Sequence, residues 1–121
     1  MSTESAMTII TALVRPQMEG RVVLALHDLA DFPGFFILEA RGQGRGRGVG
    51  GSYQATEFDL TYHRYLQFEI VCRTTAADEI QRVIANAAWT GRKGDGVIFT
   101  ADAKSFVRIR EIGEATAEKS Q

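Results

Sequence analysis

Apolar residues form short runs, or alternate with polar residues, in four segments of the chain, a pattern that is typical of β-strands. The segments with this pattern are residues 7–14, 35–40, 66–72, and a last one made of 97–100 and 106–112 with an interruption near residue 102. Apolar residues recur at helical spacing over residues 19–29 and again over 80–88. The second helix is predicted to open with a capping box from Thr75 to Asp78 and to end at Gly91.

The order strand–helix–strand–strand–helix–strand is that of the ferredoxin-like split βαβ fold. We therefore predict an α+β sandwich in which two helices cover one face of an antiparallel sheet. Phe35 or Phe36, Tyr65 and Val71 are expected to point away from the helices. That face must be polar or be buried by another subunit, so the pattern predicts an oligomer.

The regular pattern is confined to one domain, predicted over residues 7–113. Residues 1–6 are expected to form a disordered N-terminus, and residues 114–121 a polar, frayed C-terminal tail. Between the second and third strands, residues 41–51 hold six of the chain's 12 glycines and have no hydrophobic periodicity. A mobile loop is therefore predicted over residues 42–59.

Composition narrows the class of protein. The 121 residues are 45% hydrophobic and 24% charged, and the net charge of −1 gives no general attraction to nucleic acid or to an anionic membrane. Cys72 is the only cysteine, so no internal disulfide forms and a reducing compartment is favoured. The polar start lacks the layout of a signal peptide, and no apolar run approaches the length of a membrane span. We expect a soluble cytoplasmic protein that does not insert into a membrane.

The glycine-rich stretch from Thr90 to Gly96 and the later pair Arg108 and Arg110 are the best candidates for chemistry. On a strand, the two arginines would point to the same side, because side chains alternate along a strand. Glycine N–H groups and paired guanidinium groups together bind phosphate. The alternative is a glycine-capped helix followed by a solvated basic strand. Trp89 is interpreted as an anchor of the helix end in the core.

No catalytic residue is predicted, because no serine, cysteine or lysine stands beside a histidine in a nucleophile motif and no Walker A motif occurs. We therefore expect a protein that is not an enzyme. The alternative is a weak ATPase that hydrolyses a triphosphate beside Asp95. His27, His63 and Cys72 lack zinc-ligand spacing. The histidines are interpreted as surface residues rather than as ligands of a metal shared between subunits.

The stretch from Arg41 to Gly48 resembles an RGG segment, which would contact single-stranded RNA. It has only three arginines and no interleaved aromatic residues, and the chain is slightly acidic. An RNA-binding module is therefore kept only as an alternative, and no nucleic-acid partner is expected.

Residues 90–99 and the Arg-Ile-Arg at 108–110 resemble the B-loop and the C-terminal region of PII signal-transduction proteins. Arg15-Pro16 is similar to the end of that family's first strand, and residues 39–45 are similar to the entry into its long T-loop. The family's pattern is followed without insertions from Gly34 to Arg110. The chain is thus identified as a PII-like protein.

The resemblance implies a homotrimer that binds adenine nucleotide (ADP, AMP or ATP) in clefts between subunits. T-loops would project from the trimer and engage a target protein. Four parts of the structure would contribute nucleotide-binding residues. These are the base of the T-loop (Gly42, Gly44 and Arg45), the third strand (Glu69 and Val71), the B-loop (Thr90, Gly94, Asp95 and Gly96) and the adjacent subunit (Arg108 and Arg110).

The chain departs from the family at several positions. Gly46, Tyr65 and Val97 replace a glutamine and two lysines that help hold Mg-ATP with 2-oxoglutarate. Valine offers no hydrogen-bond donor, so 2-oxoglutarate is not expected to bind by the usual mode. ADP or AMP is expected to compete for the site better than ATP, and Mg²⁺ would accompany ATP if ATP binds. Phe58 replaces the tyrosine that is uridylylated in enteric members. Phe36 replaces a threonine near the adenine. Its ring would either stack on the base or only pack against other side chains.

These departures indicate a divergent branch of the family. Such branches tend to serve a transporter, a metal-efflux pump or a bicarbonate system rather than the control of nitrogen metabolism through glutamine synthetase. The expected target is therefore a protein partner, of which a membrane transporter is one type.

Overall fold

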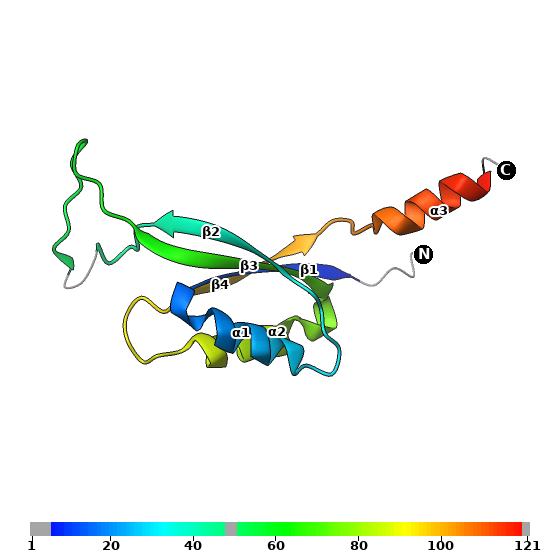
Figure 1. Cartoon of the computed structure of the whole chain (residues 1–121), viewed down its shortest axis with the longest axis horizontal. Coiled ribbons are helices and arrows are strands. Elements are labelled where there is room, and N and C mark those ends of the chain that lie inside the picture. Colours follow the sequence, from blue (N-terminus) through cyan, green and yellow to red (C-terminus); the bar gives the residue numbers. More distant parts are fainter. Residues whose placement is uncertain (1–5, 48–50, 120–121) are drawn as a thin grey trace.

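The computed structural model describes residues 6–47 and 51–119. In chain order its elements are β1 (Met7–Val14), a short 3-10 helix (Pro16–Met18), α1 (Glu19–His27), β2 (Phe36–Gly42), β3 (His63–Arg73), α2 (Thr74–Ala88), β4 (Gly96–Ala103) and α3 (Ile109–Lys119). The strands form one antiparallel sheet in the order β2-β3-β1-β4 (Figure 1). This arrangement confirms the predicted ferredoxin-like α+β fold.

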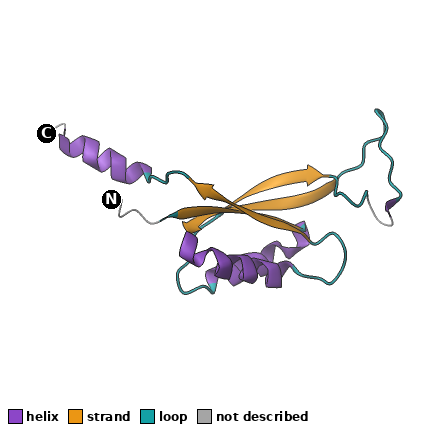
Figure 2. Ribbon diagram, turned by 180° about the vertical axis from the view of Figure 1, so that it is seen from behind, coloured by secondary structure: helices purple, strands orange, loops and turns teal. Residues whose placement is uncertain are grey.

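Helices α1 and α2 pack side by side on one face of the sheet (Figure 2). Alternate residues of β1 and β3 point toward them, because successive side chains of a strand lie on opposite faces. Each large side chain buried in this way contributes about 1.5–3 kcal/mol. The buried core consists of Ile10, Ala12, Val14, Val22, Leu26, Leu66, Phe68, Ile70, Cys72, Ala77, Ile80, Ile84 and Ala88.

The opposite face of the sheet carries exposed apolar side chains, because no helix covers it in the described chain (Figure 1). Phe36, Leu38, Val97 and Phe99 are each about half exposed there, and Tyr65 and Val71 alternate with buried residues of β3. The pairing register places Phe36 opposite Glu69 and Phe99 opposite Thr11. Of the two phenylalanines considered for this face, Phe36 lies on it, whereas Phe35 packs against the core.

The strand predicted at residues 106–112 is wrong. Strand β4 ends at Ala103, which pairs with Met7, the first residue of β1. Beyond that point β1 offers no neighbour, so the chain leaves the sheet as an exposed segment and becomes α3 at Ile109. Helix α3 projects beyond the end of the sheet (Figure 1) and continues to Lys119, so much of the segment expected to be a frayed tail is helical.

The predicted ends of the other helices need smaller corrections. Helix α1 ends at His27 rather than at Leu29. The capping box predicted for α2 is absent: the helix begins at Thr74, and its N-cap Arg73 makes no side-chain capping bond. Instead, the Thr74 hydroxyl hydrogen-bonds the Thr8 hydroxyl (2.7 Å), which ties the start of α2 to β1.

Candidate functional site

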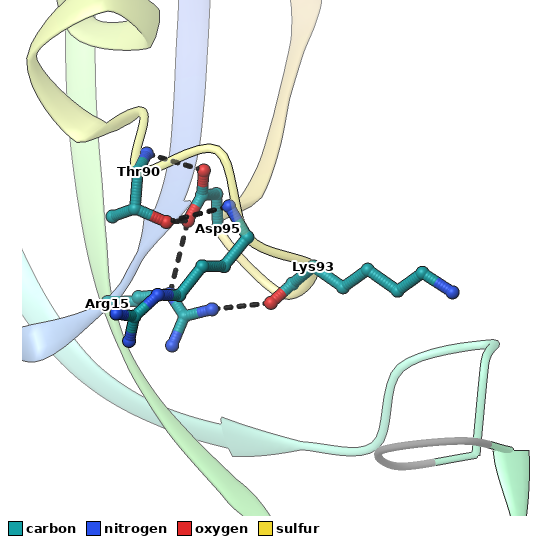
Figure 3. Close-up of polar contacts among 5 residues, drawn as sticks. Arg15, Thr90, Lys93 and Asp95 are labelled. Atoms are coloured by element: carbon teal, nitrogen blue, oxygen red, sulfur yellow. Dashed lines mark hydrogen bonds and ion pairs between the residues drawn. The ribbon is translucent and has the colours of Figure 1, made fainter.

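The loop between α2 and β4 is closed by the side chain of Asp95 (Figure 3). One carboxylate oxygen accepts a hydrogen bond from the Thr90 N–H (2.7 Å), and the other accepts one from the Thr90 hydroxyl. The Arg92 N–H donates to the Thr90 hydroxyl oxygen (3.1 Å). These bonds join the two ends of the loop and fix its path.

Arg15, at the end of β1, reaches the same loop. Its Nε donates to Oδ1 of Asp95 (3.2 Å), and its Nη2 donates to the carbonyl oxygen of Lys93 (Figure 3). The Arg15 and Asp95 side chains are only 26% and 22% exposed, so this ion pair is less solvated than an ordinary surface pair. The loop is therefore fixed by hydrogen bonds between its own residues and by the bonds of Arg15 at the end of β1.

The two glycines that flank Asp95 have backbone angles that other residues rarely adopt. Gly94 has φ +89°, and a Cβ there would lie 3.3 Å from the Arg15 guanidinium; Gly96 has φ +120°. In the described part of the chain, the N–H groups of Lys93 and Gly94 donate no hydrogen bond. Free N–H groups and glycines of this kind are the features with which loops bind anions in proteins.

The same hydrogen bonds act on the ionisation of Asp95. Bonds from the Thr90 hydroxyl and then from the Thr90 N–H, with a smaller effect of Arg15, hold the pKa of the Asp95 carboxyl below its ordinary value. Because this pKa is lower in the folded state than in the unfolded chain, the contacts stabilise the folded loop above about pH 4. That stabilisation is lost as the pH falls through the lowered pKa.

An acid titration is therefore expected to release the Thr90 amide with a midpoint below about pH 3.9, the value of an unperturbed aspartate. The chemical shift of the Thr90 amide proton, followed by NMR, measures this midpoint. The control variant Asp95→Asn should remove the transition. A midpoint at or above the ordinary aspartate value would show that these contacts do not favour the charged carboxylate.

A hollow of about 350 Å³ lies beside this loop and is lined by Arg15, Gly94 and residues 62–65. Residues 62–65 include the start of β3, where the long loop from β2 ends. The α2–β4 loop and one end of the long loop therefore face the same space.

The long loop is tied together near its base by the hydroxyl of Tyr53. This hydroxyl accepts hydrogen bonds from the Gln43 side chain (3.2 Å) and the Thr61 N–H (2.7 Å), and donates to the Asp59 carbonyl oxygen (3.1 Å). Residues 48–50 of the segment predicted as a mobile T-loop lie outside the described residues. The mobility of the segment stays a prediction.

The predicted site residues occupy four separate places in the chain, of which Arg108 and Arg110 form the last. The α2–β4 loop brings together Thr90, Gly94, Asp95 and Gly96, while Gly42, Gly44 and Arg45 lie where β2 passes into the long loop. Glu69 and Val71 lie on the uncovered face of β3. There, Oε1 of Glu69 accepts hydrogen bonds from the Thr11 hydroxyl (2.6 Å) and the Gln67 side chain (3.0 Å).

Arg108 and Arg110 lie far from the α2–β4 loop of the same chain. Strand β4, which has 8 residues and is therefore about 26 Å long, lies between the loop and the two arginines in the chain. Figure 1 shows α3 beyond the opposite end of the sheet from this loop. The expectation that they project together from a strand is wrong, because Arg108 precedes α3 and Arg110 lies within it. Arg110 pairs with Glu114 (2.9 Å), and Arg108 approaches Glu111 at 3.9 Å. Both side chains remain largely exposed.

Two contributions to this region were missed or misinterpreted in the sequence. Arg15 was singled out only as part of an Arg-Pro pair, and its contact with Asp95 spans 80 positions. Trp89 is 68% exposed and is not a core anchor, because α2 ends at Ala88 and the extended backbone of Trp89 turns its ring outward. The ring lies instead against Gly91, which has φ +82° in the loop and is not the residue that ends the helix.

Among the residues that the structure describes, no group of three or more His, Cys, Asp or Glu side chains is arranged to hold a metal ion. None of the described helices has the length and apolar character needed to cross a membrane.

Comparison with known proteins adds independent information. A sequence model of the family described as nitrogen regulatory protein P-II matches residues 7–112. The nitrogen regulatory protein GlnK of Escherichia coli (strain K12) is 29% identical over 109 residues, which are 90% of this chain and 96% of that protein. Nitrogen regulatory protein P-II of Synechocystis sp. is 35% identical over 109 residues, with the same coverage. The crystal structure of Arabidopsis thaliana PII bound to citrate aligns with a TM-score of 0.68 and 24% identity, covering 88% of this chain and 86% of that one.

Proposed function

Since this chain belongs to the nitrogen regulatory protein P-II family, we propose that it is a signal-transduction regulator that binds adenine nucleotide in clefts between its subunits. The bound nucleotide biases the conformation of the long loop after β2, and that loop controls a target protein. The protein acts by binding and catalyses no reaction.

The observation that carries this proposal is the fixed α2–β4 loop. Its free N–H groups at Lys93 and Gly94 are held in place before any ligand arrives, since Asp95 and Arg15 already determine the path of the loop. Preorganised N–H donors of this kind bind phosphate oxygens without an ordering cost at the time of binding.

A homotrimer supplies the rest of the site. Arg108 and Arg110 are too far from the α2–β4 loop of their own chain to touch a nucleotide bound there, so a neighbouring subunit has to contribute them. The half-exposed apolar side chains of Phe36, Leu38 and Phe99 favour the same conclusion, because a face of this kind is stabilised by contact with another subunit. We propose three subunits, the number that the resemblance to PII proteins implies.

The long loop is the segment whose conformation is proposed to change when nucleotide binds. One end of it faces the hollow beside the α2–β4 loop, so a ligand in that hollow contacts both loops. A nucleotide can shift the loop only if it binds one loop conformation more tightly than another. The coupling therefore resides at the base of the loop, near Gly42 and Gly44.

The residues around the site favour a short phosphate chain. Val97 and Tyr65 stand where lysines would neutralise further charge, so ADP and AMP are favoured over Mg-ATP, and 2-oxoglutarate does not bind by the usual mode. Asp95, which an ATPase would need beside a triphosphate, already accepts three hydrogen bonds from Thr90 and Arg15. The proposed target is a protein of nitrogen metabolism or a transport system, approached from the cytoplasm.

The proposal is tested by titrating the purified protein with ADP, AMP and ATP in a calorimeter and measuring its mass by light scattering. We expect one ADP per subunit and a mass of about 40 kDa, which corresponds to three chains of 13.3 kDa. Adding 2-oxoglutarate should not strengthen ATP binding. A monomer that binds none of the three nucleotides would overturn the proposal.

A further inference from the structure

We propose that Arg15 is a positioning residue for the nucleotide's phosphates: it holds the α2–β4 loop so that the Gly94 N–H is presented to them. This inference rests on the proposed function, since it assigns a role to a residue that supports that site. Arg15 acts through the loop and not by touching the ligand.

The backbone of Arg15 is anchored before its side chain reaches the loop. Val14 precedes it as the last residue of β1 and is paired on both sides, with Leu66 of β3 and with Gly96 of β4. The Arg15 carbonyl oxygen accepts a hydrogen bond from the N–H of Met18 (2.9 Å), the last residue of the following 3-10 helix. The guanidinium is therefore carried by a residue that directly follows a strand end paired on both sides.

The two contacts of the guanidinium set the orientation of one peptide group. In a trans peptide, the carbonyl of Lys93 and the N–H of Gly94 point in opposite directions. Because Nη2 of Arg15 binds that carbonyl, the Gly94 N–H points away from Arg15 and is left free for an anion. Nε of Arg15 holds Asp95, the residue that follows Gly94, so the peptide is held from both sides.

The residue types fit this role. Arginine presents its Nε and Nη2 donors in a rigid planar fork, whereas the ammonium group of lysine acts as a single point. Gly94 leaves room for the fork, since a Cβ at this position would lie only 3.3 Å from Nη2. With Asp95 as its partner, the Arg15 charge is largely neutralised within the loop.

The test compares Arg15→Gln and Arg15→Lys with the matched control Arg21→Gln, an exposed arginine of α1. Fluorescence of Trp89, the only tryptophan, reports binding of ADP and of adenosine, which lacks phosphate. Arg15→Gln should weaken ADP binding about tenfold and leave adenosine binding unchanged, with Arg15→Lys in between. Amide hydrogen exchange without ligand should become faster across residues 90–96 in Arg15→Gln. Arg21→Gln should resemble the unmodified chain in every measurement.

Other outcomes overturn the inference. Weaker ADP binding with unchanged loop exchange would mean that Arg15 touches the phosphates itself. Equal losses for ADP and adenosine, with a lower melting temperature, would mean that Arg15 only supports the fold. If the unmodified chain binds no ADP, the proposed function fails, and the exchange measurement still decides whether Arg15 fixes the loop.

Discussion

Replacing Gly96 by alanine is expected to lower the free energy of unfolding by about 4 kcal/mol or more, an effect reserved for severe steric conflicts. A Cβ at this position would lie 1.7 Å from the carbonyl oxygen of Leu13, and the backbone has φ +120°. Leu13 belongs to β1, and among the described residues β4 pairs with no other strand, so neither backbone can move without breaking the ladder. Urea denaturation followed by circular dichroism measures the change.

Gly20→Ala is the matched control for this experiment. Gly20 lies in α1, and nothing lies within 4 Å of a Cβ built there. Alanine is favoured over glycine in a helix interior by about 0.5–1 kcal/mol, so the control should be unchanged or slightly more stable. Equal urea midpoints for Gly96→Ala and Gly20→Ala would show that β4 does not approach β1 as closely as described.

Replacing Arg108 or Arg110 by alanine is expected to weaken ADP binding by about 1.5–3 kcal/mol each, if each guanidinium makes a charge-assisted bond to a phosphate. The loss of their exposed pairs with Glu111 and Glu114 accounts for little, because surface ion pairs contribute about 0–1 kcal/mol. Calorimetry measures the affinities. Arg82→Ala, which removes an exposed arginine of α2, is the control and should bind ADP normally.

Mixing subunits tests whether the arginines act on a neighbour. Co-expression of the Arg110→Ala chain with a Gly94→Ala chain should restore part of the ADP binding, because some clefts then combine an intact loop with an intact arginine. Unchanged ADP affinity in both single arginine variants would remove these residues from the site. No recovery in mixed oligomers would show that loop and arginine belong to the same chain.

The strands and helices around the core could be predicted because their signals are local. Leu66, Phe68 and Ile70 alternate with polar residues, and such a period specifies a strand with one buried face wherever it lies in the sheet. The β1 range, Met7–Val14, was predicted to the residue. The last strand failed because a strand also needs a neighbour: residues 106–112 have a strand-like pattern, but β1 has no residue left to pair with them.

Some residues of the candidate site could likewise be predicted from local sequence, and others could not. Gly94 and Gly96 were identified from the motif, since positive backbone angles favour glycine whatever surrounds them. The partner of Asp95 at the end of β1 and the exposure of Trp89 could not be identified, because both depend on where the α2–β4 loop lies relative to the sheet.

The amino-acid sequence alone determined the periodic elements, the glycine loop and, through its family resemblance, the kind of protein this is. These depend on neighbouring residues and on a motif that retains its meaning in isolation. Only the tertiary structure decided that Arg15 holds the loop and that Arg108 and Arg110 lie at the far end of β4. Contacts between residues 80 positions apart are set by how the sheet pairs, and no local pattern encodes that pairing.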